Sequence, residues 1–471
     1  MIMKFKKYFI LLAVFYLFIS CFEDLDDKIY PASTLDIQNF IYRGLNYFYL
    51  YKADTPELAN HAFESSSERD AFLKSFDSPE TLFSYLLSPQ DRFSVLCSDY
   101  REIENALSGV SLSNGMEFGL VYYPDNSGKV FGYVRYVLPN SSAASKNLER
   151  GDLFTTVNGT QLTSQNYSRL LAADSYTIGL ASFDGTDFEL TGEEIELTKT
   201  EYDENPVFLN RTFDYNGQKI GYLVYNSFIK RYDTELNTVF SQFKSEGVTD
   251  LILDLRYNGG GSVETATDLG SMITGQFNGE IFYKQIWNED RQSEYGREGR
   301  FDNTISNGNS IHSLNLNRVY ILTTKNTASA SELVINGLNP YINTVQIGDT
   351  TTGKFQASIL LYDGPAPFFS RQEASISHRY AMLPLVYKAA NKDNHTDFVN
   401  GLPPDVSFKE NFFNLGELGD PNEPLLSIAL AEILGLPKPV SSEQILQEFS
   451  SSRTKSPLHE IMVIEPEDIF N

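Results

Sequence analysis

Four short, predominantly apolar segments constrain the fold of this chain most strongly. They cover residues 220–225, 251–255, 319–322 and 345–348. A strand that is apolar along its whole length is buried on both faces, which is typical of a parallel sheet with helices on either side. Between the first two segments, apolar residues recur at helical spacing from Leu236 to Phe243, and this order predicts a β-α-β unit. The repeated pattern predicts an α/β core over residues 206–410.

The segments on either side of this core have different patterns. Residues 36–108 lack β-type alternation and carry Ser, Asp and Pro at intervals, which predicts a small helical domain. Residues 109–200 contain short strand-like runs separated by turn residues, and these predict a β-rich module. After residue 410 one clear helical pattern runs from Leu425 to Leu434. We therefore expect a helix and then a polar tail over residues 411–471.

The first twenty residues form a separate segment. Three lysines precede an apolar run of 12 residues, from Tyr8 to Ile19, and Cys21 follows shortly after. A bilayer-spanning helix needs about 20 apolar residues, so a membrane span is the weaker alternative to a signal peptide over residues 1–20. The run with its cysteine resembles the bacterial lipobox, which implies a lipid on Cys21 and a tether over residues 21–35. An ordinary signal peptide with an incidental cysteine is the alternative.

The charge balance restricts the partners of the chain. It has 37 basic and 62 acidic residues, a formal charge of −25, and such a surface repels nucleic acid because phosphate binding needs a basic face. Beyond Cys21 only Cys97 remains, and no Cys/His cluster has zinc spacing, so we expect neither a disulfide framework nor a metal. Acidic residues at 23–27 resemble surface-export signals. We expect a lipid-anchored protein of the bacterial cell envelope, at the outer membrane and facing the periplasm or the cell surface.

A glycine-rich segment follows the second apolar strand. Residues 254–261 read Asp-Leu-Arg-Tyr-Asn-Gly-Gly-Gly. Consecutive glycines allow positive φ and leave backbone amides uncovered, so the segment can bind an anion, either a phosphate or the oxyanion of acyl transfer. A flexible turn is the simpler interpretation. No Gly-Lys-Ser/Thr follows, which disfavours a phosphate-binding loop.

Two further motifs carry candidate catalytic groups. Residues 327–332 read Thr-Ala-Ser-Ala-Ser-Glu and open a helix directly after a strand, where the Ser329 hydroxyl would lie near first-turn amides as a nucleophile requires. Ser329 and Glu332 also match a capping box, and taken alone the motif favours the cap. Lys354 follows Gly353 in a turn after the strand at 345–348. A single lysine in a loop is usually solvated.

The combination of these motifs is more specific than any one of them. Asp-Leu-Arg-x-Asn-x-Gly-Gly, then Ser-Ala-Ser-Glu, then Thr-x-Gly-Lys, with the lysine twenty-five residues after the serine, resembles the carboxyl-terminal processing (tail-specific) protease family. The resemblance implies a ClpP/crotonase-like α/β core and a serine endopeptidase that acts on proteins or peptides without a cofactor. Its site residues would be Ser329 as nucleophile, Lys354 as general base, and Gly259, Gly260 and Ala330 as oxyanion-hole donors. Lys354 must then be neutral, so its pKa has to fall from about 10.4 through burial.

One family feature does not carry over. The family often places a glutamine four residues after the lysine to orient it, but Ser358 stands there and Gln356 lies at the second position. Either residue could take over this role. The third member of the site therefore stays open.

The β-rich module also resembles a known domain. The segments 139–144, 148–152 and 157–159 resemble the PDZ domain that these proteases carry before their core. A PDZ groove adds a peptide as an extra strand and binds its terminal carboxylate on loop amides. The resemblance places this peptide-binding site at Phe118, Gly119 and Leu120, and it implies recognition of substrate C-termini. A β-rich spacer without a ligand is the alternative.

Three other functions remain open. The first is a catalytically silent peptide- or ligand-binding lipoprotein on the same fold. The second is a Ser-His-Asp hydrolase, although no Gly-x-Ser-x-Gly surrounds Ser329 and only His378 has an ordered-looking flank in the core. The candidate histidines are His61, His312, His378, His395 and His459. The third is a structural adaptor, for which the helical domain alone would suffice.

Overall fold

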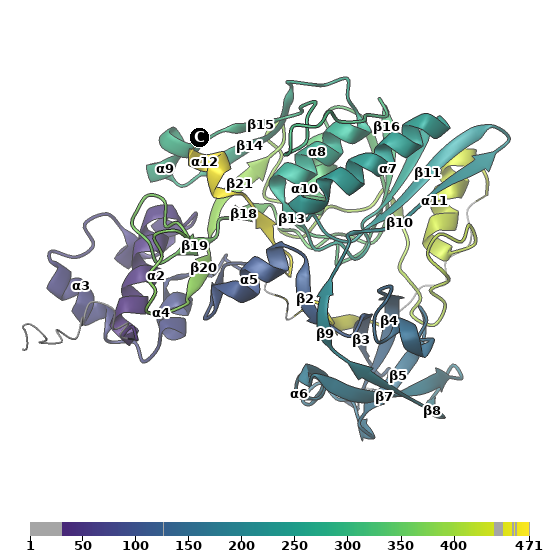
Figure 1. The fold of residues 1–471 in the computed structure, drawn as a ribbon, viewed down its shortest axis with the longest axis horizontal. Helices are drawn as coiled ribbons and strands as arrows, with labels where there is room; N and C mark the ends of the chain where they lie inside the picture. Colours follow the sequence, from purple (N-terminus) through teal and green to yellow (C-terminus); the bar gives the residue numbers. More distant parts are fainter. Residues whose placement is uncertain (1–30, 126, 438–445, 455, 457–458, 471) are drawn as a thin grey trace, which may run out of the picture.

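The computed structural model describes residues 31–125, 127–437, 446–454, 456 and 459–470. The predicted signal segment, Cys21 and most of the predicted tether lie outside these residues. Figure 1 shows three parts: N-terminal helices in purple, a β-rich module in blue and a larger α/β part in teal and green. Within the described residues, no helix combines the length and the apolar character that crossing a membrane requires.

The core sheet confirms the predicted α/β class. Its order is β10 (Val207–Tyr215), β11 (Gln218–Tyr225), β12 (Asp250–Asp254), β16 (Arg318–Thr323), β17 (Asn343–Gly348) and β22 (Val406–Ser407). The strands from β11 to β22 are parallel, and only β10 runs antiparallel to its neighbour. The four apolar segments are the four central strands. Their side chains are buried on both faces, which explains their continuous apolar pattern.

Helices cover both faces of this sheet. One face packs against α7 (Asp233–Glu246), which follows η5 (Lys230–Tyr232), and against α8 (Val263–Ile273) and α10 (Ala330–Leu338). Among the described helices, only α11 (Pro424–Leu434) packs on the other face, so α11 lies opposite α7, α8 and α10 in Figure 1. Successive residues of β12 alternate between the two sides, with Leu253 in the first cluster and Ile252 in the second.

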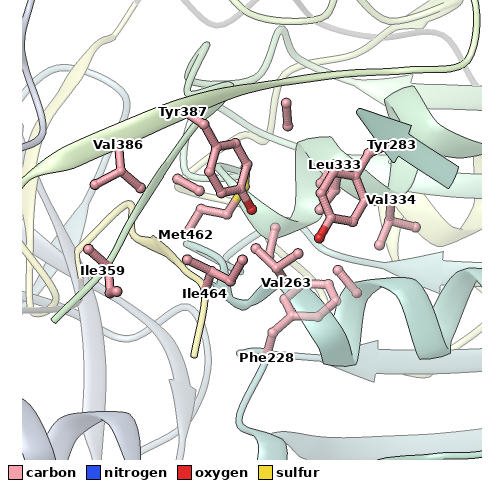
Figure 2. Packing of buried hydrophobic residues seen from close by; sticks show 14 of the residues in the cluster. Phe228, Val263, Tyr283, Leu333, Val334, Ile359, Val386, Tyr387, Met462 and Ile464 are labelled. Carbon is pink, nitrogen blue, oxygen red and sulfur yellow. The ribbon is translucent and has the colours of Figure 1, made fainter. Parts of the chain in front are cut away.

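A second sheet packs beside α8 and α10. Its order is β13 (Gly261–Ser262), β24 (Met462–Val463), β18 (Gln356–Ser358), β21 (Leu385–Ala390), β14 (Ile281–Trp287) and β15 (Glu298–Arg300), with α9 (Glu289–Tyr295) after β14. Strand β24 comes from the C-terminal segment and lies between β13 and β18. Figure 2 shows Met462 and Ile464 packed among Val263, Leu333 and Tyr387. The C-terminal segment is therefore part of the core.

The N-terminal part is mainly helical, as expected. It contains α2 (Thr34–Phe48), η2 (Lys52–Asp54), η3 (Pro56–Leu58), α3 (Ser66–Leu73), α4 (Pro79–Leu86) and α5 (Tyr100–Leu107). Serine residues cap the N-termini of α2, α3 and α4, because Ser33, Ser65 and Ser78 each accept a hydrogen bond from a first-turn amide. The short strand β1 (Val95–Cys97), which periodicity did not predict, pairs with β20 (Ala381–Leu383). Strand β20 pairs with β19 (Leu361–Tyr362), and this sheet joins the helices to the core.

The β-rich module is a sheet closed by one helix. It contains β3 (Met116–Tyr122), β4 (Val130–Val137), η4 (Ala144–Lys146), β5 (Leu153–Val157), β6 (Thr160–Gln161), α6 (Tyr167–Ala172), β7 (Ser175–Phe183) and β8 (Phe188–Thr198). A two-stranded stem of β2 (Val110–Ser113) and β9 (Thr200–Asp203) leads into and out of it. The edge strand beside β3 is β23 (Glu448–Ser451), which again comes from the C-terminal segment.

The C-terminal segment differs from the predicted polar tail. Its described residues form β23, β24 and α12 (Pro466–Phe470). In Figure 1 this yellow segment passes beside β3 and continues past β13 and β18 to α12. Strands of two to four residues are too short to show periodicity, and they form here only because β3, β13 and β18 offer them partners.

Candidate active site

Ser329 lies in a sharp turn between β16 and α10. Its backbone has φ 67° and ψ −114°, a region that residues with a side chain rarely adopt and that costs about 1–3 kcal/mol. The Oγ atom is buried and makes no hydrogen bond within the described part of the chain. The hydroxyl therefore does not act as the helix cap that the motif alone favoured. The Ser329 amide donates to Oε2 of Glu332 at 2.8 Å, which is the reciprocal contact of a capping box.

Glu332 joins the serine turn to the lysine loop. Its Oε2 also accepts from the Lys354 amide at 2.8 Å, and its Oε1 accepts from the Gly353 amide at 2.7 Å and from Thr351 Oγ1 at 2.5 Å. Burial raises the pKa of the Glu332 carboxyl to about 7, although these hydrogen bonds oppose the rise. The backbones of Ser329 and Lys354 are thus fixed around one carboxylate oxygen. The sequence analysis had assigned Glu332 only to the cap.

Lys354 is buried rather than solvated. Its Nζ makes no hydrogen bond to any described residue and lies 4.9 Å from the centroid of the Phe93 ring. Burial lowers the pKa of the Lys354 amine to about 7, and nearby Asp91, Glu460 and Glu332 partly oppose the shift. Near neutral pH a large fraction of this amine is therefore uncharged. Lys354 and Ser329 make no direct hydrogen bond, as is common for catalytic pairs without a bound substrate.

The glycine-rich segment is a fixed loop rather than a flexible turn. Asn258 has no exposed surface, and its Nδ2 donates to the Tyr225 carbonyl at 2.8 Å. Its Oδ1 accepts from the Gly260 amide at 2.9 Å, and its carbonyl accepts from the Ala328 amide at 3.0 Å. Asn258 therefore fixes both the glycine loop and the turn that precedes Ser329.

Gly260 lies directly against the serine side chain. Its φ is 109°, and a Cβ atom at this position would lie 2.6 Å from Cβ and 2.9 Å from Oγ of Ser329. Of the three predicted oxyanion-hole residues, Gly260 has its amide engaged by Asn258. Ala330 is the first residue of α10, where helical amides lack intrahelical acceptors. Gly259 neighbours the C-terminal segment, because its Cβ position lies 3.4 Å from the Glu460 nitrogen.

The two candidate orienting residues lie on β18. Gln356 Nε2 donates to the Tyr51 hydroxyl at 2.7 Å. Ser358 Oγ has no hydrogen-bond partner in the described residues. Neither side chain bonds to Lys354, so the third member of the site stays a prediction.

The predicted peptide-binding residues Phe118, Gly119 and Leu120 lie within strand β3 rather than in a loop. Strand β3 pairs with β4 on one side. On its other side it pairs with β23 of the C-terminal segment. The groove edge is therefore occupied by the chain itself.

Two of the candidate histidines have partners away from Ser329. His378 Nε2 lies 2.9 Å from Asp363 Oδ2, and its Nδ1 accepts from the Tyr380 amide at 3.0 Å. His395 Nδ1 pairs with Asn336 Oδ1 at 2.9 Å. Within the described residues no histidine bonds to the Ser329 hydroxyl. The same residues contain no group of three or more His, Cys, Asp or Glu side chains that could hold a metal ion.

The Asp-Leu-Arg motif forms a buried ionic network behind the glycine loop. Arg256 Nε donates to both oxygens of Asp254 at 3.0 Å, and its other nitrogens bond to Glu423 at 2.7 and 3.1 Å. Glu410 accepts from Arg256 at 3.0 Å and from Arg150 of the β-rich module at 2.8 Å. The network thus connects the sheet end, the start of α11 and the β-rich module.

Comparison with known sequences places the chain among proteases. A sequence model of peptidase family S41 matches residues 219–364, and one of the peptidase S41 N-terminal domain matches residues 36–95. A carboxyl-terminal-processing protease from Picosynechococcus sp. is 25% identical over 236 residues, covering 48% of this chain and 52% of that protein. A chloroplastic C-terminal processing peptidase from Tetradesmus obliquus is 25% identical over 312 residues, covering 63% and 62% respectively.

The match therefore spans about half of the first relative's length and less than two thirds of the second's. Among solved structures, a Bacteroides fragilis protein assigned to the S41 proteases superposes with a TM-score of 0.64 at 26% identity, over 87% of this chain and 98% of that chain. The sequence matches include both the helical segment and the core that carries Ser329 and Lys354. Residues 36–95 and 219–364 thus match the two domain models of peptidase family S41, and the chain is similar to carboxyl-terminal processing proteases.

Proposed function

We propose that this protein is a serine endopeptidase with a Ser-Lys catalytic pair. Ser329 is the nucleophile and Lys354 the general base. The observation that carries the proposal is the state of Lys354: its amine is buried, has no hydrogen bond to a described residue and has its pKa lowered to about 7. The Glu332 carboxylate holds the backbone amides of both Lys354 and Ser329, and Ser329 lies in a strained turn. An amine in this state can accept a proton near neutral pH, whereas a solvated lysine cannot.

The proposed reaction follows from these groups. Neutral Lys354 takes the proton from Ser329 Oγ as the oxygen attacks the peptide carbonyl carbon. Backbone amides of Ala330 and Gly259 stabilise the oxyanion, and the Gly260 amide joins them if it leaves Asn258 Oδ1. Lys354 then gives the proton to the leaving amine. Water hydrolyses the acyl-enzyme with Lys354 again as the base.

The substrate and location are part of the proposal. We expect the protein to be exported, carried by a lipid on Cys21, and to cleave exported proteins or peptides recognised through their C-termini. The β-rich module acts as a PDZ domain in this account, and the substrate pairs with the side of β3 where β23 now lies. Its resemblance to that domain and the signal-like residues 1–20 support these points.

A cleavage assay tests the proposal. The soluble form, residues 22–471, is incubated with an unfolded protein that has a free apolar C-terminus. Cleavage should be lost in Ser329→Ala and in Lys354→Ala. Lys325→Ala is the matched control, because Lys325 lies in the neighbouring loop but is exposed, and it should cleave as the unchanged protein does. Equal cleavage by all variants would refute the Ser-Lys pair, and no cleavage by any would favour the silent binding protein on the same fold.

A further inference from the structure

The candidate catalytic pair is completely covered. Ser329 and Lys354 each have 0% exposed surface, so no substrate carbonyl can reach the Ser329 hydroxyl in this conformation. The covering backbone includes residues 459–461 of the C-terminal segment. The Ile461 carbonyl accepts from the Gly261 amide at 2.7 Å and lies 2.4 Å from the position that a Cβ on Gly260 would take. The chain's own backbone thus occupies the approach to Ser329.

The segment continues as a strand beside the active-site loops. Strand β24 pairs in parallel with β13, which begins at the last glycine of the loop, and with β18, which begins two residues after Lys354. The Ile464 amide donates to the Ser358 carbonyl at 3.0 Å. An extended peptide in this channel would use the same backbone groups.

The earlier part of the segment occupies the groove of the β-rich module. Strand β23 runs antiparallel to β3, with Ser450 opposite Leu120 and Ser451 opposite Gly119. The Ser452 amide extends the pairing by donating to the Phe118 carbonyl at 3.0 Å. The three residues predicted to bind a peptide strand are thus paired with a strand of the same chain.

The side chain of Phe449 fills the space between β3 and α6. Its ring stacks on Tyr122 with centroids 4.3 Å apart and meets the edge of Tyr167, from α6, at 5.4 Å. Phe449 packs against the hydrophobic core of the module. Aromatic contacts of this geometry contribute beyond the burial of surface. Phe449 is thus the apolar anchor of β23.

Glu448 supplies the charged anchor. It forms an ion pair with Arg135, which is 2% exposed, and it accepts from the Tyr133 hydroxyl. Its Oε1 also accepts from Asn326 Nδ2 at 3.2 Å, and Asn326 lies in the loop that leads to Ser329. Glu448 provides the only ion pair of Arg135 within the described residues. The C-terminal segment therefore neutralises a cation buried between the groove and the serine loop.

One cavity connects the groove beside β3 with the active centre. A cavity of about 580 Å³ is lined by Phe118 and Tyr167 at the groove, by Arg135, and by Gly260 and His459 at the active centre. A peptide bound in the groove can therefore continue to the active centre. The C-terminal segment lines this path at both ends.

We propose that the C-terminal segment is an intramolecular pseudosubstrate that keeps the protease closed. It holds the groove through residues 446–454 and the active centre through residues 459–464. A substrate displaces β23 by pairing with β3 through an extended segment that presents an aromatic side chain to Tyr122 and a carboxylate to Arg135. This inference rests on the proposed function, because it regulates the same site.

The two ends of the segment differ in how firmly they are held. Met462 and Ile464 are buried in the main core, as Figure 2 shows, so β24 is expected to stay in place. Strand β23 has four residues, an irregular register and a half-buried Phe449. The groove end therefore opens first, and it frees the described residues that precede β24.

A binding experiment tests the inference without catalysis. The probe is a fluorescent, C-terminally amidated peptide with the sequence of residues 446–454. It is titrated into full-length Ser329→Ala protein and into the same protein with Phe449→Ala. We expect the peptide to bind at least 10-fold more tightly to the Phe449→Ala protein, because the resident strand competes less. Equal affinity for both proteins, or binding to neither, overturns the inference.

Two further variants control this experiment. Gln447 is exposed and directly precedes this strand, so Gln447→Ala should bind the peptide as the Ser329→Ala parent does. Glu448→Gln keeps the side-chain shape but removes the charge that faces Arg135, and it should also bind more tightly than the parent. If Phe449→Ala fails to fold, the Glu448→Gln comparison decides the outcome by the same criterion.

A cleavage experiment in the active background completes the test. Phe449→Ala should cleave an unfolded protein several-fold faster than the unchanged chain, and Gln447→Ala should cleave at the unchanged rate. If the unchanged chain cleaves measurably and Phe449→Ala cleaves no faster, the inference is overturned while the proposed function stands. Cleavage that persists in Ser329→Ala overturns the proposed function, while the peptide titration still decides whether the segment occupies the groove.

Discussion

At the scale of single residues, the site depends on burial more than on direct contacts. Lys354 has no charged partner within hydrogen-bonding distance among the described residues, and its lowered pKa comes mainly from loss of solvent. Ser329 is held by its backbone through Glu332, while its hydroxyl has no hydrogen-bond partner in the part of the chain that the structure describes. In this way a nucleophile and a base can be positioned while their reactive atoms make no structural hydrogen bonds.

The pH dependence of cleavage follows from Lys354. The amine is the base only when it is neutral, so kcat/KM should rise with pH through about 7, the pKa of Lys354, and level off above it. The measurement is the initial rate of cleavage between pH 5.5 and about 9 at constant ionic strength. A rate that falls across this range would exclude a neutral lysine as the base.

The stability of the protein should respond to the same group. The folded state lowers the pKa of Lys354 to about 7, so between pH 7 and about 10.4 the unfolded chain binds more protons than the folded one. The free energy of unfolding of the unchanged protein, relative to Lys354→Met, should therefore increase with pH in this window, by up to about 1.4 kcal/mol per pH unit. Below pH 7 the difference should be constant. Urea unfolding at several pH values checks this, and a difference that shrinks above pH 7 contradicts it.

Gly260 should tolerate no side chain. An alanine there would require φ 109°, and its Cβ would collide with the Ile461 carbonyl and the Ser329 side chain. We expect Gly260→Ala to lower kcat/KM by at least about 100-fold, because displaced catalytic groups lose their alignment. Gly308→Ala is the control: Gly308 also has positive φ, 83°, but has open space around it. Its alanine variant should lose only about 1–2 kcal/mol of stability from backbone strain and keep its activity.

At the scale of elements, length and burial decided what could be predicted from the sequence. The strands β11, β12, β16 and β17 were predicted because their side chains are buried on both faces, and helix α11 because it repeats over three turns. Strands β1, β23 and β24 were not predicted. Each has two to four residues and owes its conformation to a partner distant in sequence.

Only part of the candidate site could be predicted from the sequence. Ser329, Lys354 and the glycine loop were identified because their order and spacing form a motif. The roles of Glu332 and Asn258 were not, because each acts by connecting loops that only the folded chain brings together. The covering segment at residues 459–461 gave no sequence signal, since its contact with Gly260 and Gly261 depends on backbone atoms.

The ionic network is an element-scale feature with a measurable effect. Arg256→Met leaves Asp254, Glu410 and Glu423 buried without their shared cation, and breaking a buried pair in this way costs about 3–5 kcal/mol. Denaturant unfolding should show this loss. Arg318→Met removes an arginine that is 45% exposed and pairs with Asp250, so it should cost less than about 1 kcal/mol. Similar losses for both variants would contradict the importance of burial.

At the scale of the whole molecule, the C-terminal segment connects all three parts. It adds β23 to the β-rich module and β24 to the second sheet of the core, and Phe470 lies against Phe48 of α2 with ring centroids 6.4 Å apart. The groove and the active centre are therefore linked by one covalent segment. We therefore expect substrate binding in the groove to control access to Ser329.

The most direct test of the central claim identifies the serine that becomes acylated or phosphonylated. The protein is incubated with a small fluorophosphonate at pH 8, digested, and its modified peptide is mapped by mass spectrometry. We predict an adduct on Ser329 that is absent in Lys354→Met, because without the base the hydroxyl is not activated. An adduct confined to another serine, or equal labelling of Ser329 in Lys354→Met, would contradict the Ser-Lys mechanism.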